Sequence, residues 1–285
     1  MIQNISPIIQ PDELLALREN THFVLIDVRT GPDAYGKYLQ QHLEGALHLD
    51  LEVQLADKKP DAAHGGRHPL PEPAKFAELL AQYGISTDSH VVVYDHANGA
   101  NAAARCWWML RAIGLNSVQV VNGGFQAAVN AGFPVSATTE TQPSKGNLTA
   151  HQWLLPVATM EEVALAVHLD NFLVIDVRDA ARYRGEVEPF DAIAGHIPGA
   201  ENIPYTGNLD ADGFFLSPLQ LREKYSHALA GKDQDHVIVH CGSGVTACHT
   251  LLAMDYAGLG ISKLYVGSWS EWSRSGRPIA TKTKK

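Results

Sequence analysis

The chain has 285 residues, of which 45% are hydrophobic and 19% charged, an ordinary globular composition with enough length for two domains. The formal net charge of −9, from 22 basic and 31 acidic residues, excludes nucleic acid as an expected partner, although a small anion could still meet a local positive field. Three cysteines without a C-x-x-C spacing argue against a disulfide framework and against a zinc site. The N-terminal residues lack the pattern of a secretory signal and no apolar run is long enough for a bilayer, so we expect a cytoplasmic protein with no membrane partner.

Short apolar runs rich in β-branched residues predict strands, in chain order, at residues 23–28, 91–94 and 118–121. Helical patterns at residues 73–84 and 101–114 alternate with them. This alternation is typical of an α/β fold with a mostly parallel sheet and helices on both faces.

Four sequence patterns occur twice in the same order, roughly 150 residues apart, which indicates two homologous domains. The clearest is "FVLIDVR" from Phe23, which returns as "FLVIDVR" from Phe172. The other three begin at His42, His90 and Val120 and return at His196, His236 and Tyr265. We therefore expect an N-terminal domain over residues 1–138, a polar linker over 139–155 and a C-terminal domain over 156–285.

The second copy places Cys241 directly after an apolar strand, where the first copy has Asp95. Two glycines after the cysteine allow the backbone to curl, so that loop N–H groups form an anion-binding site at the start of the next helix. A thiolate is stabilised in such a site and is nucleophilic, whereas the alternative reading is a buried core thiol. The predicted anion-binding residues are Gly242, Ser243, Gly244, Val245 and Thr246.

Cysteine-dependent phosphatases also use a cysteine in such a loop, but they need an arginine six residues later to hold the phosphate. Ala247 occupies that position, which argues against a phosphatase. His240 is expected to cap the strand end. Cys106 and Cys248 lie within helical patterns and are predicted to be packed helix thiols.

Four motifs together resemble the two-domain rhodanese family of sulfurtransferases, over nearly the whole chain: "CGSGVTA" from Cys241, "DVRDAARYRGEVEP" from Asp176, "GHIPGA" from Gly195 and "GSWSEW" from Gly267. The resemblance implies two rhodanese domains, of which the N-terminal one is inactive because Asp95 replaces the cysteine. It also implies transfer of sulfane sulfur through a Cys241 persulfide, without a metal or cofactor. The loop is more similar to those of mercaptopyruvate sulfurtransferases than to those of thiosulfate:cyanide sulfurtransferases.

The implied donor is a small anion, thiosulfate or 3-mercaptopyruvate, and the implied acceptor is cyanide, a thiol or a thioredoxin-like dithiol protein. A persulfide carrier or regulatory module that serves one protein partner is the alternative function. Either reading requires the same loop around Cys241.

Arg182 is the predicted donor-binding cation, because the first copy has lost the cysteine and carries Asp33 at the matching position. The family places a substrate arginine there. The pair Asp176 and Arg178 recurs in the first copy, which favours a structural role for it. Arg184 is a second candidate for the donor, with solvated surface as its alternative.

The second copy is longer than the first between Arg182 and His196. Members of the mercaptopyruvate type place a second substrate arginine just after the Glu-Pro of this segment, where this chain has Phe190 and Asp191. The departure indicates one missing contact to a donor carboxylate, and it leaves the choice between the two donors open.

The resemblance further implies a Ser/His/acid relay that assists turnover of mercaptopyruvate. Ser243 is the matching serine, and His68 and Glu52 are the candidate histidine and acid from the N-terminal half. Arg67, next to His68, is a further cation for the same site.

Overall fold

The computed structural model describes residues 5–18, 23–141 and 143–281, which divide into two compact units. Unit 1 comprises Met1–Asp57, Pro71–Leu155 and Ala211–Phe215, and unit 2 comprises Lys58–Leu70, Pro156–Asp210 and Leu216–Lys285. Two short segments therefore pack outside the domain in which the sequence repeat places them. The segment Lys58–Leu70 matters most, because it brings Arg67 and His68 into unit 2.

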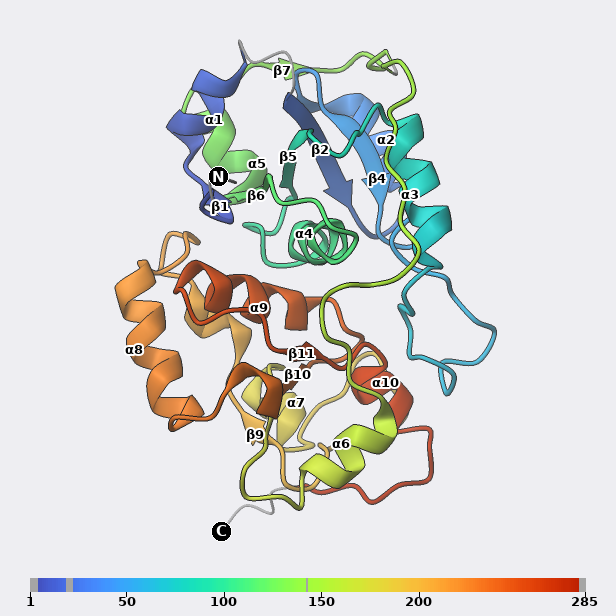
Figure 1. Cartoon of the computed structure of the whole chain (residues 1–285), viewed down its shortest axis with the longest axis vertical. Coiled ribbons are helices and arrows are strands. Elements are labelled where there is room, and N and C mark those ends of the chain that lie inside the picture. The colour runs from blue at the N-terminus through green and yellow to red at the C-terminus, as the bar shows by residue number, and fades with distance from the viewer. Residues whose placement is uncertain (1–4, 19–22, 142, 282–285) are drawn as a thin grey trace. The chain divides into compact units, whose positions relative to one another are not determined.

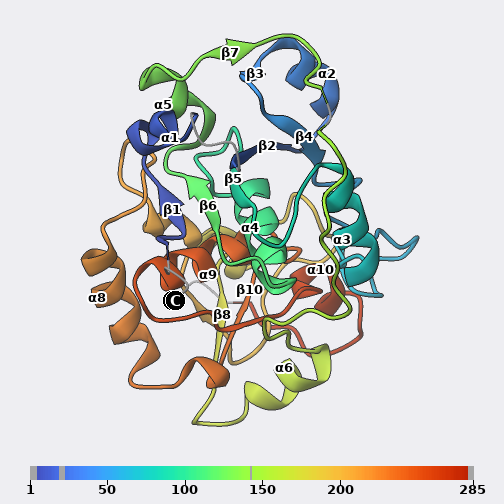
Figure 2. The same cartoon turned by 45° about the horizontal axis from the view of Figure 1, so that its top comes forward.

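In the described part of unit 1, five parallel strands form a sheet in the order β1-β6-β5-β2-β4 (Figure 2). The strands are β1 (Ile8–Ile9), β2 (Phe23–Arg29), β4 (Leu47–Asp50), β5 (His90–Tyr94) and β6 (Val118–Val121), and an antiparallel pair is formed by β3 (His42–Leu43) and β7 (Val135–Ser136). The helices are α1 (Pro11–Leu17), α2 (Ala34–Gln40), α3 (Pro73–Gln82), α4 (Ala102–Ala112) and α5 (Gly124–Asn130). The strands and helices predicted in this half are all present.

Unit 2 repeats this topology, with parallel strands in the order β11-β10-β8-β9, of which β11, β10 and β9 are labelled in Figure 1. A parallel bridge from Val157 to Leu264 stands in the place of β1, and an antiparallel bridge from His196 to Ala280 matches the one from His42 to Ser136. The strands are β8 (Leu173–Asp176), β9 (Glu201–Asn202), β10 (Val237–His240) and β11 (Lys263–Leu264). The helices are α6 (Met160–Ala166), α7 (Ala180–Tyr183), η1 (Tyr205–Asn208), α8 (Pro218–Leu229), η2 (Gln234–His236), α9 (Thr246–Tyr256) and α10 (Ser268–Trp272).

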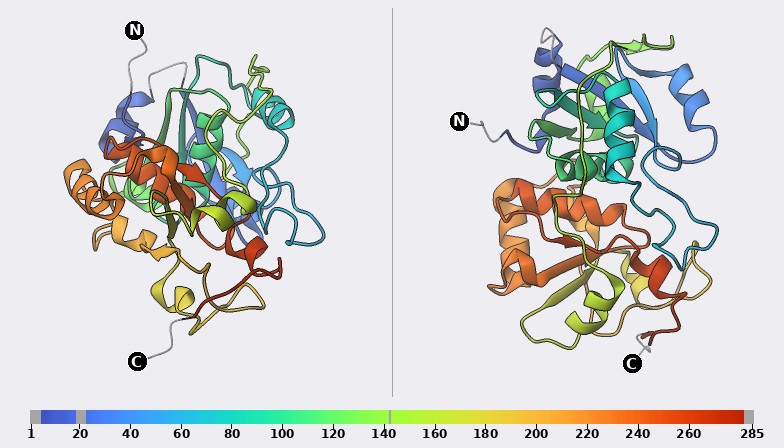
Figure 3. Two further views of the ribbon diagram at one scale, coloured as in Figure 1. Left: turned by 60° about the horizontal axis from the view of Figure 1, so that its bottom comes forward. Right: turned by 45° about the vertical axis from the view of Figure 1, so that its right-hand side comes forward.

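Helices cover both faces of each sheet, because successive strand residues point to opposite sides. In unit 2, Ile238 of β10 packs in one apolar cluster with Val163 of α6 and Trp269 of α10, while α9 packs against β10 from the other face (Figure 3). In unit 1, Val92 of β5 belongs to the corresponding cluster with α1 and α5. The predicted α/β fold is confirmed. No helix in the described ranges is both long and apolar enough to cross a membrane.

A buried aspartate–arginine pair follows the same strand in both units. Arg29 donates from Nε and Nη2 to the two carboxylate oxygens of Asp27, each over 2.9 Å. Arg178 pairs with Asp176 at 2.7–3.1 Å and also donates to the carbonyl oxygen of Gly195 over 2.7 Å. Each pair ties the end of its strand to the next segment, which supports the structural role that the repeat predicts.

Asp95, the counterpart of Cys241, fills an anion site made by its own loop. Its Oδ1 accepts the N–H groups of Ala97 and Gly99 over 2.8 Å, and its Oδ2 accepts those of Asn101 and Ala103 over 3.1 Å. Ala97 and Gly99 lie in the loop, whereas Asn101 and Ala103 lie at the start of α4, where the helix dipole also favours a negative charge. The loop of unit 1 is thus an anion site whose anion is part of the chain.

We expect Asp95→Ala to destabilise the protein by about 3 kcal/mol, because it leaves four N–H groups of the loop without their acceptor. Urea unfolding followed by circular dichroism measures the change. Asp88→Ala, an exposed aspartate of the same unit, is the matched control and should change the stability little. An unchanged stability of the Asp95 variant would contradict the role assigned to its carboxylate.

The strand-end residue before each loop differs between the units. Tyr94 donates its hydroxyl proton to Asp27 over 2.8 Å, whereas His240 lies 3.9 Å from Asp176 and shares a hydrogen bond of 3.2 Å between its Nδ1 and the Cys241 carbonyl oxygen. Burial lowers the pKa of the His240 imidazole more than the neighbouring Asp176 carboxylate raises it. His240 is therefore neutral in the folded protein at neutral pH.

A lowered folded-state pKa makes stability depend on pH in one direction. An unfolded histidine has a pKa of about 6.5, and above that pH His240 is neutral in both states and does not change the free energy of unfolding. Below that pH, His240 binds a proton in the unfolded chain but stays neutral in the folded chain, which favours unfolding. We expect the free energy of unfolding to fall as the pH decreases from 6.5 towards 5, and His240→Gln to reduce that slope by up to about 1.4 kcal/mol per pH unit. Urea titrations at several pH values measure this slope, and equal slopes for the wild-type protein and His240→Gln would refute the assignment. Burial also lowers the pKa of His48, which therefore contributes equally to the slopes of the two proteins.

Candidate functional site

Cys241 follows β10 directly and precedes α9, which begins at Thr246. Its side chain is only 1% exposed, and the N–H of Ser243 points at its Sγ over 3.5 Å. This N–H belongs to the predicted anion-binding loop and matches the position from which Ala97 donates to Asp95 in unit 1. The Ser243 N–H and the start of α9 thus favour a negative charge on the sulfur.

The segment that ends in α10 holds this loop in shape. The N–H groups of Trp269 and Ser270 donate to the carbonyl oxygens of Cys241 and Gly242 over 3.1 and 2.9 Å. Ser268 adopts a left-handed backbone with φ of 53°, and its hydroxyl accepts the Cys241 N–H over 3.2 Å. The sequence analysis did not reveal this support. The repeated pattern was a signal for it, because in unit 1 the Phe125 N–H binds the Asp95 carbonyl oxygen in the same way.

Gly244 is required by the close approach of the loop to the residues that follow β11. Its φ is +74°, and a Cβ at this position would lie 2.5 Å from the Val266 carbonyl oxygen. Only glycine fits here without moving the backbone. The predicted loop geometry therefore depends on a contact that is distant in sequence.

Two guanidinium groups converge on the other glycine of the loop. A Cβ on Gly242 would lie 3.1 Å from Nη2 of Arg67 and 3.3 Å from Nη2 of Arg182. Arg182 was expected at the site from the comparison of the two copies. Arg67 arrives from Lys58–Leu70, which belongs to unit 2. Two positively charged guanidinium groups therefore lie beside Gly242, the residue that follows Cys241.

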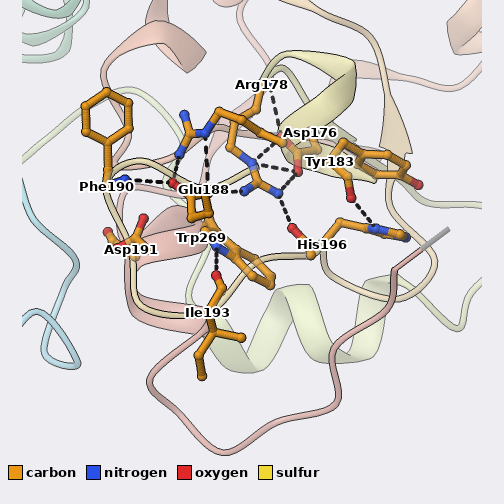
Figure 4. A network of polar contacts seen from close by, with 12 residues as sticks. Asp176, Arg178, Tyr183, Glu188, Phe190, Asp191, Ile193, His196 and Trp269 are labelled. Carbon is orange, nitrogen blue, oxygen red and sulfur yellow. Dashed lines mark hydrogen bonds and ion pairs between the residues drawn. The ribbon is translucent and has the colours of Figure 1, made fainter. Parts of the chain in front are cut away.

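Glu188 links Arg182 to the buried pair of Asp176 and Arg178, and Figure 4 shows Glu188 beside that pair. Its Oε1 accepts Nη2 of Arg182 over 2.7 Å, and its Oε2 accepts Nη1 of Arg178 over 3.1 Å. Burial alone would lower the pKa of Arg178, but Asp176, Glu188 and Cys241, when it is a thiolate, raise it. Arg178 therefore adds to the positive field at Cys241 as well as tying the strand end.

Arg67 is held by residues of the same longer segment of the second copy. Asp191, whose side chain is fully buried, pairs with Arg67 and, over 2.6 Å, with Nη1 of Arg274. The Phe190 ring lies 5.6 Å from the Arg67 guanidinium carbon and 5.0 Å from that of Arg182. The sequence indicated a missing cation at Phe190 and Asp191; these two residues instead hold a guanidinium from elsewhere in the chain.

The candidate relay is only partly assembled within one unit. His68 Nδ1 lies 2.8 Å from Ser243 Oγ, so these two residues share a hydrogen bond inside unit 2. Glu52 belongs to unit 1, where it accepts the Thr30 hydroxyl over 3.3 Å. The serine and histidine are thus brought together by the packing of Lys58–Leu70 on unit 2.

The remaining candidates have other contacts. Arg184 is partly exposed and pairs with Glu186 over 2.9 Å. Cys248 is buried and its Sγ lies 3.3 Å from the Gly244 carbonyl oxygen, while burial raises the pKa of the Cys106 thiol. No group of three or more His, Cys, Asp or Glu residues in the described ranges is placed to hold a metal ion.

Comparison with known proteins agrees with the fold and with the family that the motifs resemble. The model of the rhodanese-like domain matches the chain twice, over residues 10–131 and 159–275. The chain is 38% identical to a probable 3-mercaptopyruvate sulfurtransferase from Pseudomonas aeruginosa, over 94% of this chain and 96% of that protein, and 39% identical to a putative thiosulfate sulfurtransferase from Mycobacterium tuberculosis, over 91% of each. The solved structure of the 3-mercaptopyruvate sulfotransferase SseA from Escherichia coli superimposes with a TM-score of 0.78 and 32% identity, over 94% of this chain and all of that one.

These matches span both copies of the repeat and nearly the full length of each relative. The similar proteins include both 3-mercaptopyruvate and thiosulfate sulfurtransferases, so the matches do not distinguish between these two donors. The chain belongs to the rhodanese family, and it is a two-domain sulfurtransferase of the 3-mercaptopyruvate or thiosulfate type that acts through a cysteine persulfide.

Proposed function

We propose that Cys241 carries the persulfide and that 3-mercaptopyruvate is the preferred donor. The observation that carries this choice is the pair of guanidinium groups, from Arg67 and Arg182, beside Gly242. A guanidinium presents two parallel N–H groups that match the two oxygens of a carboxylate. Two of them next to the nucleophile suit a donor whose carboxylate lies two carbons from its sulfur-bearing carbon.

In the first half-reaction, the Cys241 thiolate attacks the sulfur of 3-mercaptopyruvate. An S–S bond forms as the bond between that sulfur and C3 breaks, and its electron pair passes to C3 as the enolate of pyruvate. A proton then reaches C3, and the donor thiol itself supplies the equivalent proton, leaving pyruvate and the anionic persulfide. The loop N–H groups and the buried Arg178 stabilise that anion.

We propose that the Ser243 and His68 pair moves this proton. The 2.8 Å contact between Ser243 Oγ and His68 Nδ1 supports a relay that takes the proton from sulfur and returns it at C3. Thiosulfate needs no such proton, because sulfite leaves as an anion. A requirement for the relay therefore separates the two donors.

In the second half-reaction, a nucleophilic acceptor attacks the outer sulfur of the persulfide. The S–S bond to Cys241 breaks, and the thiolate of Cys241 is restored. A thiolate acceptor becomes a persulfide and cyanide becomes thiocyanate. We propose a small thiol or a reduced dithiol protein as the acceptor.

We expect the wild-type protein to gain about 32 Da, one sulfur atom, after incubation with donor and removal of excess. Cys241→Ser should abolish this adduct, because a serine hydroxyl does not form a persulfide. Intact-mass spectrometry measures it, and Cys248→Ser, which changes a buried thiol of the same unit, is the control that should retain it. An adduct of equal yield on the Cys241 variant would refute the assignment.

We expect kcat/KM of the wild-type protein for 3-mercaptopyruvate to exceed that for thiosulfate by at least about tenfold. Ser243→Ala should lower kcat with mercaptopyruvate by about 100-fold, the scale of a lost proton relay, and change the thiosulfate reaction much less. Steady-state release of pyruvate and of sulfite measures the two reactions. A wild-type preference for thiosulfate, or equal losses with both donors, would contradict the proposed donor and relay.

A further inference from the structure

The segment from Glu188 to Asp191 has no counterpart in the shorter first copy and contacts both guanidinium groups beside Gly242. Glu188 pairs with Arg182 and Asp191 pairs with Arg67. Between them, Phe190 stays 64% exposed, and its ring lies within 5.6 Å of both guanidinium carbons. Cation–π attraction and two carboxylates thus bring two arginines from distant parts of the chain to one place.

The backbone of Lys58–Leu70 and the guanidinium of Arg67 are held by different groups. The N–H of Gly65 donates to Glu271 over 2.8 Å, and the N–H of Arg67 donates to the Ser270 hydroxyl over 3.0 Å. These bonds place the backbone but do not by themselves fix the long Arg67 side chain. Its ion pair is with Asp191, so the carboxylate of Asp191 decides where the guanidinium stays.

One carboxylate, that of Asp191, pairs with two arginines, so part of their positive charge is left to attract an anionic ligand. Its Oδ2 pairs with Arg67 and its Oδ1 with Arg274, so one buried carboxylate faces two guanidinium groups. Arg274 in turn donates to the Ser270 carbonyl oxygen over 2.7 Å, which anchors it to α10. The group of three keeps one positive charge in excess, and Arg67 is the member that reaches the Cys241 loop.

We propose that Asp191 is a positioning residue that selects donors with a carboxylate, by holding the Arg67 guanidinium beside that of Arg182. Asp191 acts through Arg67 and does not itself touch the donor. Arg67 is then the second cation for the donor, and Phe190 and Asp191 hold its guanidinium in place. This inference rests on the proposed function, because it concerns how mercaptopyruvate is recognised.

The test compares 3-mercaptopyruvate with mercaptoacetone, which keeps the thiol and the ketone but has a methyl group in place of the carboxylate. In the wild-type protein, KM for 3-mercaptopyruvate should be much lower than KM for mercaptoacetone. Asp191→Asn keeps the size of the side chain and removes its charge. It should raise KM for mercaptopyruvate about tenfold, the scale of a lost charge-assisted hydrogen bond, with kcat nearly unchanged and mercaptoacetone kinetics unaffected.

Asp235→Asn, an exposed aspartate of unit 2, is the matched control and should behave as the wild-type protein with both donors. A rescue variant tests whether the position of the cation is what counts. Arg67→Ala should lose the discrimination between the donors, and adding Phe190→Arg to it should restore part of that discrimination. Thermal unfolding verifies that each variant is folded.

The outcomes separate two failures. If Asp191→Asn keeps the full wild-type discrimination, or loses activity equally with both donors, the positioning role is refuted. If the wild-type protein itself does not prefer mercaptopyruvate to mercaptoacetone, the proposed donor fails before Asp191 is considered. A selective loss in Asp191→Asn, absent from Asp235→Asn, supports the inference.

Discussion

A tight loop between a parallel strand and a helix has N–H groups that need an anion, and both units are organised around this constraint. In unit 1 the anion is the carboxylate of Asp95, which takes four N–H groups of its own loop. In unit 2 the same position holds Cys241, and the Ser243 N–H points at its sulfur. A carboxylate is a permanent acceptor for its loop, whereas a thiol at the same position leaves the loop with a side chain that can react, as we propose for Cys241.

The positive charges of unit 2 follow from the same constraint. A thiolate and an anionic donor must share one place, so more than one cation is needed beside the loop. Arg178 lies in the buried network, and Arg182 and Arg67 lie beside Gly242. Each is paired with a buried carboxylate, because an unpaired arginine in such a position is costly. The carboxylates therefore decide where each guanidinium lies.

Several features were predictable because they depend on local pattern. The strands of unit 1 followed from β-branched runs, and the duplication followed from four repeated motifs. Cys241 followed from its place after a strand and before two glycines, and Arg182 from its replacement by Asp33 in the first copy. Each of these inferences uses residues that are close together in the chain or that match between the copies.

The other contacts join segments that no local pattern relates. Arg67 and His68 meet the Cys241 loop only because Lys58–Leu70 packs on unit 2, although the sequence repeat assigns it to the first half. Asp191 shows the same limit, since its sequence neighbours did not reveal that it binds Arg67 and Arg274. The sequence by itself determined the fold, the duplication and the place of Cys241 between a strand and a helix. Tertiary structure decided which cations lie beside the Cys241 loop, because long side chains are placed by distant partners rather than by their own neighbours.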